Sequence, residues 1–345
     1  MTDAMVLHAA RDMRREQRAD DPLGPEDVRV DFAAGGICGS DIHYYLDGAS
    51  GDFRLVEPLI LGHEIAGTVS AIGPAVTRVK PGDPVAIYPA RTCGVCPACR
   101  AGRENLCPET FFFGSASRRP HMQGGFRRSI PVHQNQCYVQ PVGFDPTLSA
   151  FAEPLAVCLH GVSRAGDTVA GGRVLVVGGG PIGQLLALAA RQAGAAFVAV
   201  SDLLPEPRAM ATLLGADLAV DATDTDQLAT VAADGLDVVF EASGAPAGAA
   251  AALALVRKGG VVVQVGNMPG DDTALPVYHL GRKEIDWKGS MRFPRAAFER
   301  SVAAITSGTI DVSPLLSHRL PLTEAGAAIE LAADRRQAMK VMLVA

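Results

Sequence analysis

The amino-acid sequence predicts an α/β protein in which a doubly wound parallel sheet is joined to a second, β-rich domain. From Gly172 onward, apolar strand-like runs alternate with helix-like runs, which is the pattern of a parallel sheet covered by helices. Before that point, Gly and Pro break the chain into short segments, which is typical of short strands. The length of 345 residues is enough for about two domains, each with its own core.

The first 150 residues contain five short apolar segments that we expect to form strands. Their spacing predicts a β-rich domain, and the loops that join such strands carry much of a protein's chemistry. The segments are VRVDF, IAGTVSAIG, GDPVAIYP, FRRSIPV and CYVQPV.

The following part of the chain alternates regularly between strand and helix. RVLVVGGG is a continuous apolar strand that enters a glycine turn, and PIGQLLALAARQAG then has Pro at the start and Gly at the end of a predicted helix. Further strands are predicted in AFVAVSD, ADLAVDA, GLDVVFEASG and GGVVVQVGN, with helices in PEPRAMATLLG and in the run that ends at Lys258. After about residue 288 the alternation loosens, so the helix TEAGAAIELAADRR and the strand KVMLVA need not belong to this sheet.

Composition excludes several classes of protein. Hydrophobic residues make up 48% and charged residues 20%, which is typical of a globular chain. The formal net charge of −6 argues against a nucleic-acid partner, which would require a basic face. Charged residues interrupt the N-terminus where a secretory signal would be apolar, and no stretch approaches the roughly 18 apolar residues of a membrane span. We therefore expect a cytoplasmic protein with no membrane partner.

Gly178, Gly180 and Gly183 form a G-x-G-x-x-G turn between an apolar strand and a helix. In such a turn the first glycine permits the bend, the second admits a pyrophosphate, and the third lets helix and strand pack closely. The N–H groups at the helix start would face the phosphates. The motif alone is compatible with a purely structural turn, but Asp202 follows Gly183 by roughly 20 residues, at the end of the next strand. This context predicts a Rossmann dinucleotide-binding site.

Asp202 bears on the choice of nucleotide. Its carboxylate is placed to accept hydrogen bonds from the adenosine ribose and would repel a 2′-phosphate, so NAD is favoured over NADP. A helix cap at the strand end is the structural alternative for Asp202. Arg208 lies close enough to weaken the preference for NAD, which leaves NADP as the second choice. The remaining predicted cofactor contacts are Pro181, Ile182, Val265 and Gly266.

Four cysteines predict a structural zinc site. Cys93, Cys96, Cys99 and Cys107 follow the spacing C-x2-C-x2-C-x7-C, which lets four thiolates converge on Zn²⁺ as a tetrahedron. Disulfides and an iron–sulfur cluster are the alternatives, but seven cysteines leave one unpaired, and the proline and second motif of a ferredoxin are absent. Four protein ligands leave no open position, so this zinc would stabilise a loop and perform no chemistry.

A second group of potential metal ligands is spread over three segments. Each residue has an ordinary structural alternative, such as a buried cysteine, a packed histidine or a helix charge. Together they indicate a metal site. The residues are Cys38, Ser40, Asp41 and His43 in GGICGSDIHYY, His63 and Glu64 in LGHEIAG, and Glu153 in FAEPLAV.

These motifs and their order resemble the zinc-containing medium-chain alcohol dehydrogenase superfamily over nearly the whole chain. CGSDIHYY, FFGSA, GGF, AFAEPLAV and GSMRF are similar to its polyol branch, which includes sorbitol dehydrogenases, and most closely to the bacterial L-idonate 5-dehydrogenases. The resemblance implies a GroES-like zinc-binding catalytic domain formed by residues 1–150 and 289–345. It places the Rossmann dinucleotide-binding domain at residues 151–288.

The resemblance assigns Cys38 and His63 as ligands of a catalytic zinc and leaves Glu64 and Glu153 as alternatives for the third ligand. Classical alcohol dehydrogenases have a cysteine at the position of Glu153. In polyol relatives Glu64 often binds the metal directly, while the residue that matches Glu153 holds the zinc-bound water. With the four-cysteine site, two Zn²⁺ ions are expected per chain.

A proton relay is also implied by the resemblance. Ser40 would take the proton of the substrate hydroxyl and pass it through the nicotinamide ribose to His43. Zinc would act as a Lewis acid, and the nicotinamide would accept the hydride. The structural alternative for His43 is a histidine that only bonds the backbone.

The expected substrate is a sugar acid or a neutral polyol. A carboxylate prefers the planar fork of an arginine, and Arg292 in GSMRF matches a substrate-contacting arginine of the branch. Because polyol enzymes share this arginine, it does not discriminate between the two. Further candidate contacts are Arg118, Arg119, His121, Tyr44 and Phe113, for which a solvated surface or plain core is the alternative.

The resemblance thus implies oxidation of L-idonate to 5-dehydro-D-gluconate, with oxidation of sorbitol, xylitol or L-iditol to a ketose as the alternative. A homotetramer or homodimer is implied by the resemblance alone. A non-catalytic protein that keeps the fold would be expected to lose part of the site, whereas every site residue is present here.

Overall fold

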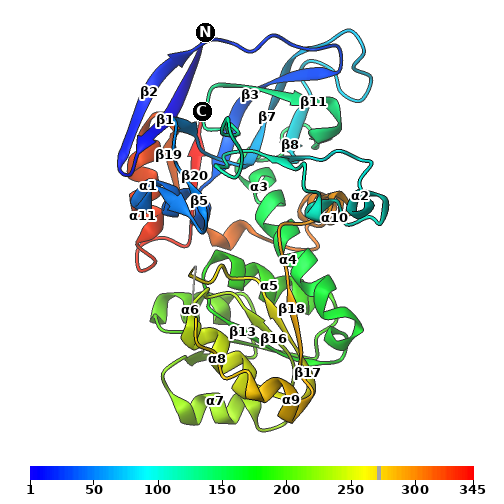
Figure 1. Cartoon of the computed structure of the whole chain (residues 1–345), viewed down its shortest axis with the longest axis vertical. Coiled ribbons are helices and arrows are strands. Elements are labelled where there is room, and N and C mark those ends of the chain that lie inside the picture. The colour runs from blue at the N-terminus through cyan, green and yellow to red at the C-terminus, as the bar shows by residue number, and fades with distance from the viewer. Residues whose placement is uncertain (270–272) are drawn as a thin grey trace. The chain divides into compact units, whose positions relative to one another are not determined.

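The computed structural model describes residues 1–269 and 273–345, which form two compact units (Figure 1). The first unit comprises Met1–Glu153 and Pro294–Ala345, and the second comprises Pro154–Phe293. The sequence placed the corresponding boundaries after residues 150 and 288, a few residues earlier in each case. No helix among the described residues has the length and apolar character needed to cross a membrane.

The first unit is built around a mixed sheet of seven strands in which β3 (Asp27–Gly36) is the hub. β3 pairs antiparallel with β7 (Glu64–Ile72), β11 (Ser129–His133) and the C-terminal strand β20 (Lys340–Val344). The sheet is completed by β8 (Pro84–Ile87), β12 (Cys137–Val139) and β19 (Leu316–Pro321). The C-terminal strand therefore lies outside the parallel sheet, which the loss of alternation after about residue 288 had left open.

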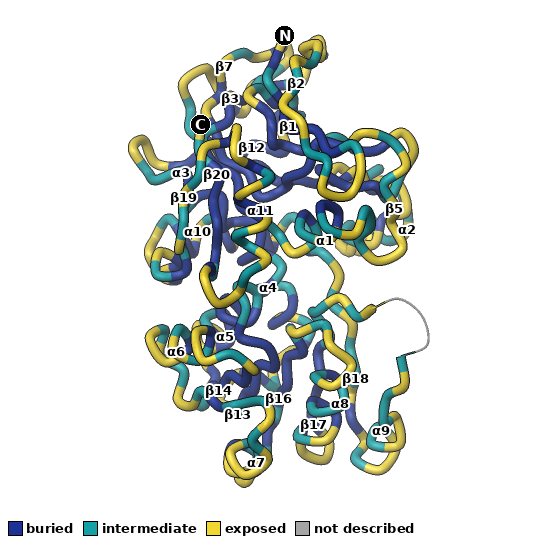
Figure 2. The backbone as a smooth tube through the Cα atoms, turned by 90° about the vertical axis from the view of Figure 1, so that its left-hand side faces the viewer, coloured by how far each residue is buried: buried dark blue, intermediate teal, exposed yellow. Residues whose placement is uncertain are grey.

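Burial in this sheet follows the alternation of its side chains. In β3, Val28, Val30 and Phe32 are buried, because alternate side chains of a strand point to the same face. They pack with Ile65 and Leu343 in one apolar core, and the buried colour of Figure 2 follows these strands. The core fixes the positions of the loops at the strand ends.

Short elements surround this sheet. The N-terminal hairpin was not predicted, because its second strand DMRREQR has no apolar alternation. The hairpin consists of β1 (Thr2–Ala9) and β2 (Asp12–Arg18) and pairs with β6 (Leu59–Ile60); the other small strands are β4 (Ala49–Ser50), β5 (Phe53–Arg54), β9 (Ala90–Arg91) and β10 (Phe111–Phe112). The helices are α1 (Gly39–Asp47), α2 (Pro97–Arg100), α3 (Pro146–Ala150), α10 (Arg295–Thr306) and α11 (Ala325–Ala333).

The second unit confirms the predicted parallel sheet. Its strand order is β15-β14-β13-β16-β17-β18, and every neighbouring pair is parallel. The order reverses between β13 and β16, which is the switch point where doubly wound sheets bind ligands. The strands are β13 (Arg173–Val177), β14 (Phe197–Asp202), β15 (Leu218–Asp221), β16 (Leu236–Glu241), β17 (Val256–Gln264) and β18 (Asp286–Gly289). The helices are α4 (Ala152–Ala165), which begins at the end of the first unit, α5 (Pro181–Gln192), α6 (Pro205–Leu213), α7 (Thr225–Ala232), α8 (Pro246–Leu255) and α9 (Tyr278–Lys283).

One predicted boundary is wrong. The helix expected to continue to Lys258 ends at Leu255, and Val256 already pairs with Leu236 of β16. The backbone of Val256 is extended, with ψ of 141°, so the strand begins as soon as the alanine-rich helix stops. Helix α7, which Asp224 caps, was not predicted.

Candidate active site

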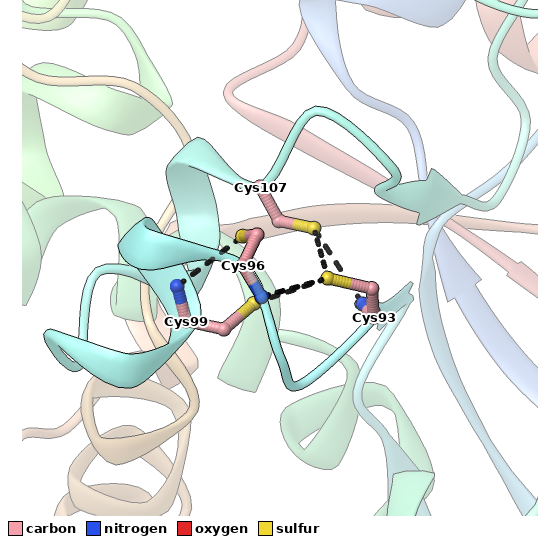
Figure 3. Close-up of side chains that lie close together, drawn as sticks. All are labelled: Cys93, Cys96, Cys99 and Cys107. Atoms are coloured by element: carbon pink, nitrogen blue, oxygen red, sulfur yellow. Dashed lines mark hydrogen bonds between the residues drawn. The ribbon is translucent and has the colours of Figure 1, made fainter.

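The four cysteines of the predicted structural site converge in one loop of the first unit (Figure 3). Their sulfur atoms all lie within 4.8 Å of one another, with Cys93 Sγ 3.5 Å from Cys107 Sγ and 4.0 Å from Cys99 Sγ. A tetrahedron with Zn–S bonds of about 2.3 Å has sulfur–sulfur edges of about 3.8 Å. Hydrogen bonds from the backbone N–H groups of Val95 and Cys96 lower the pKa of the Cys93 thiol to about 6. The donor set and its spacing therefore fit a zinc ion.

A second ligand cluster brings together three of the predicted catalytic residues. Ligand atoms of Cys38, His63 and Glu64 lie within 4.8 Å of one another. Cys38 caps the start of α1, while Glu64 is the first residue of β7 and follows His63 directly. His63 and Glu64 are buried, at 6% and 1% exposure. The structure thus collects one sulfur, one nitrogen and one oxygen donor, a set that zinc accepts.

Glu153, the other candidate for the third ligand, is outside that cluster but belongs to the same buried environment. It lies in the first turn of α4 with an exposure of 4%. Burial and, to a smaller extent, the neighbouring charge of Glu64 raise the pKa of the Glu153 carboxyl to about 8, against the opposing effect of His63.

Asp41 holds the two ligand-bearing loops together. Its fully buried carboxylate accepts hydrogen bonds from the backbone N–H groups of Cys38 at 3.0 Å and Gly62 at 3.2 Å. It also lies 3.9 Å from Nδ1 of His63. The sequence showed Asp41 in the right segment but did not assign it this role, because the contact to Gly62 depends on the tertiary fold.

Lys340 is the residue of the site that sequence reasoning missed. Its buried ammonium donates to Glu64 Oε1 at 2.7 Å and to the carbonyl oxygen of Ile37 at 2.8 Å. Glu64 Oε2 lies 2.5 Å from the same nitrogen. The buried carboxylate beside a sulfur and an imidazole fits a metal ligand. No local signal marks Lys340, which is 276 residues from Glu64 in the sequence.

The two residues of the predicted relay lie on α1. Ser40 is half-buried near the start of this helix, and His43 follows one turn later with its side chain 60% exposed. His43 Nδ1 is 3.2 Å from the Asp47 carboxylate. The relay itself therefore stays a prediction.

The predicted substrate contacts are divided over both units. Tyr44, Phe113 and His121 are buried in the first unit, and both ring nitrogens of His121 are occupied, by the Arg118 carbonyl oxygen and the Val56 N–H. Arg118 also donates to Glu109, and Arg119 is exposed. Arg292 belongs to the second unit.

Phe112, the neighbour of predicted Phe113, was not predicted as a site residue. Its ring centroid lies 5.5 Å from that of His63.

The glycine turn has the geometry of a dinucleotide site. Gly178 has a φ of +98°, and a Cβ atom at Gly183 would lie 1.8 Å from the Gly178 carbonyl oxygen. Gly180 caps α5 without a side-chain hydrogen bond, and Pro181 is the first helical residue. The N–H groups at this helix start therefore lack a side-chain cap, which fits a pyrophosphate. Ile182 follows in the same turn.

Asp202 and Arg208 lie beside this turn. The buried Asp202 carboxylate accepts from the N–H groups of Gly179 at 2.7 Å and Leu204 at 2.9 Å, so it supports the turn and the start of α6 together. Arg208 donates to the Asp221 carboxylate at 2.8 Å and to the carbonyl oxygen of Asp202.

Val265 and Gly266, the other predicted contacts, follow β17 and donate to the Glu241 carbonyl oxygen.

Comparisons with known proteins agree with this geometry. Residues 24–142 match the model of the alcohol dehydrogenase GroES-like domain, and residues 181–307 match that of the zinc-binding dehydrogenases. The chain is 40% identical to L-idonate 5-dehydrogenase (NAD(P)(+)) of Escherichia coli over 91% of both chains, and 33% identical to a sorbitol dehydrogenase of Bacillus subtilis over 99% of this chain and 96% of the relative.

Solved structures show the same relationship. The E. coli L-idonate 5-dehydrogenase superposes with a TM-score of 0.94 at 38% identity, covering 100% of this chain and 98% of that chain. A zinc-binding dehydrogenase from Sinorhizobium meliloti, solved with NADP, gives a TM-score of 0.89 at 32% identity over 100% and 99%. The chain therefore belongs to the zinc-binding alcohol dehydrogenase family, with a GroES-like domain and a Rossmann-type domain, and is an oxidoreductase.

Proposed function

We propose that this oxidoreductase oxidises a secondary hydroxyl of a sugar acid with NAD as hydride acceptor, converting L-idonate to 5-dehydro-D-gluconate. The observation that carries the proposal is the buried cluster of Cys38, His63 and Glu64 in a chain 40% identical to an L-idonate 5-dehydrogenase. Neutral polyols are the second candidate, because sorbitol dehydrogenases match at 33–36% identity.

The catalytic zinc would be held by Cys38, His63 and Glu64. Glu64 is favoured over Glu153 as third ligand because its carboxylate lies within 4.8 Å of the ligand atoms of Cys38 and His63. Glu153 would then interact with the group that occupies the open position. A zinc ion bound there would supply Lewis acidity toward the substrate hydroxyl, and a bound nicotinamide would accept hydride. The four-cysteine loop would hold the second zinc ion, for two per chain.

The protein's own residues would handle the proton. Ser40 lies two residues after Cys38, at the start of the same helix, and is the proposed acceptor of the hydroxyl proton. His43, one turn later, is exposed and paired with Asp47, so it can exchange the proton with solvent. Asp41 and Lys340 would fix the ligands without touching the substrate.

NAD is the proposed cofactor, with NADP as the alternative. The Asp202 carboxylate sits at the end of β14 beside the glycine turn, where a 2′-phosphate would meet its negative charge. Arg208 is engaged by Asp221 and would have to leave that pair to bind a phosphate. A cytoplasmic homotetramer or homodimer with small-molecule substrates remains part of the proposal, because the resemblance to the family implies such an oligomer.

A matched pair of substrates tests the proposal. L-Idonate and L-iditol differ only at C1, which is a carboxylate in the acid and a hydroxymethyl group in the polyol. We would measure zinc per chain and follow NADH formation with each substrate, with sorbitol as a third. A higher kcat/KM for L-idonate supports the sugar acid, and a higher value for L-iditol or sorbitol transfers the assignment to polyols. No turnover with any of them in a zinc-loaded protein would overturn the proposal.

A further inference from the structure

Glu241, the last residue of β16, is a fully buried carboxylate to which the proposed function assigns no role. Its Oε1 accepts from the N–H and hydroxyl of Ser243, and its Oε2 accepts from the Gly244 N–H at 3.1 Å and the Gln264 amide at 2.5 Å. Every one of these partners donates to the carboxylate, whose two oxygens act as acceptors only. Among the described residues, no lysine, arginine or histidine forms an ion pair with it.

These hydrogen bonds join two loops at the carboxyl ends of neighbouring strands. One loop, Ser243 and Gly244, follows β16, and the other, Val265 and Gly266, follows β17. The Glu241 carbonyl oxygen also accepts from the N–H groups of Val265 and Gly266, at 2.9 Å each. One residue therefore fastens the first loop with its side chain and the second loop with its backbone.

The two loops approach each other so closely that side chains are excluded. A Cβ atom at Gly266 would lie 2.3 Å from the Gly244 nitrogen, and one at Gly244 would lie 2.4 Å from the Asn267 carbonyl oxygen. The first loop also touches the glycine turn, because a Cβ atom at Gly178 would lie 2.7 Å from the Ser243 nitrogen. The carboxylate thus supports a backbone surface that is continuous with the dinucleotide turn.

The position of this surface identifies the half of the cofactor that it serves. β16 and β17 lie on one side of β13, and β14, which carries Asp202, lies on the other. A dinucleotide spans the switch point with one mononucleotide on each side. Because Asp202 is on the adenosine side, the loops held by Glu241 are on the nicotinamide side.

We propose that Glu241 is a positioning residue that sets the nicotinamide-side loops after β16 and β17 for cofactor binding. This inference rests on the proposed dinucleotide cofactor and is independent of the choice of substrate. Glu241→Gln is the sharpest variant, because the amide is isosteric. Whichever way it turns, its NH₂ group faces a backbone N–H that cannot accept a hydrogen bond, that of Ser243 or that of Gly244, so the loop after β16 loses a hydrogen bond.

The test compares the binding of NADH, a complete dinucleotide, with the binding of AMP, which corresponds to its adenosine half. Binding of NADH is followed by energy transfer from Trp287, the single tryptophan of the chain, and AMP is titrated as a competitor that occupies the adenosine side only. We expect Glu241→Gln to weaken NADH binding roughly tenfold and to leave AMP affinity within about twofold. Asp202→Asn is the matched control and should weaken both ligands. Equal loss of both ligands in Glu241→Gln, or loss of neither, would overturn the inference.

A second variant, with a smaller change, shows whether misfolding explains the loss of binding. Ser243→Ala removes one donor and keeps the carboxylate, so it should show the same selective loss at smaller size. The fluorescence of Trp287, which pairs with Val262 of β17, reports whether the sheet is intact. Failure of the unmodified protein to bind NADH would count against the dinucleotide site itself, which distinguishes the two proposals.

Discussion

Buried charges in the first unit are arranged around the metal ligands. Glu64 and Lys340 are both nearly inaccessible, and a buried ion pair is stable only when its remaining polar atoms are also satisfied. The Lys340 ammonium also donates to the carbonyl oxygen of Ile37, and both oxygens of Glu64 lie within 2.7 Å of that ammonium. The pair therefore holds the carboxylate of Glu64 beside Cys38 and His63.

Gly36 provides the space for that carboxylate. A Cβ atom there would lie 1.8 Å from Glu64 Oε2, while one at Gly39 would meet nothing within 4 Å. We predict that Gly36→Ala displaces Glu64 and lowers the zinc content from about two ions per chain toward about one. Metal analysis after gel filtration measures this, with Gly39→Ala as the control. Full zinc content in Gly36→Ala would contradict the prediction that zinc binding depends on the position of the Glu64 carboxylate seen here.

At the residue scale, the sequence predicted those parts of the site that residue type and spacing encode. The four-cysteine loop and the His63–Glu64 pair are local motifs, so they were recognised before the fold was known. Lys340 belongs to a strand at the other end of the chain, and only the pairing of β20 with β3 brings it to Glu64. Phe112 was likewise not singled out, because only the fold shows that its ring lies against His63.

At the scale of elements, the loop that carries the four cysteines also caps the start of a helix. Glu104, between the third and fourth cysteines, accepts a hydrogen bond at 2.7 Å from the N–H of Arg295, the first residue of α10. The residue that precedes α10, Pro294, provides no side-chain cap. Glu104 is therefore a remote cap, supplied by a loop that is 191 residues away in the sequence.

We predict that Glu104→Ala destabilises the start of α10 by about 1 kcal/mol, the usual cost of a lost N-cap. Amide hydrogen exchange in the first turn of α10 should accelerate by about fivefold. Glu109→Ala is the control, because Glu109 is in the same region but pairs with Arg118 instead. Unchanged exchange in Glu104→Ala would mean that packing of the helix, and not the cap, determines its stability.

The elements that the sequence predicted have a strong local signal. Strands β13 and β14 are continuous apolar runs, and α5 is bounded by Pro and Gly, so their type and order were confirmed. The end of α8 was placed three residues too late, because AALALV has no polar residue to mark the change from helix to strand. The hairpin of β1 and β2 escaped prediction because its second strand, DMRREQR, has no apolar alternation, although the first strand lies in the core of the unit.

At the scale of the whole molecule, the proposed chemistry is divided between the two units. Both ligand clusters for zinc belong to the first unit, and the glycine turn, Asp202 and Glu241 belong to the second. Each unit has a hydrophobic core of its own. Loss of metal from the first unit therefore does not require the cofactor site of the second to change.

This division predicts the result of metal removal. A chelator such as dipicolinate should first extract the zinc bound by Cys38, His63 and Glu64, because that site keeps an open position while four thiolates close the other. Turnover should fall in proportion to the first ion lost, NADH affinity should stay within about twofold, and added Zn²⁺ should restore turnover. Zinc content, activity and NADH binding would be measured on the same samples. If NADH affinity fell in step with the zinc content, the dinucleotide site would depend on the metal-bearing unit, and the two sites could not be treated as independent.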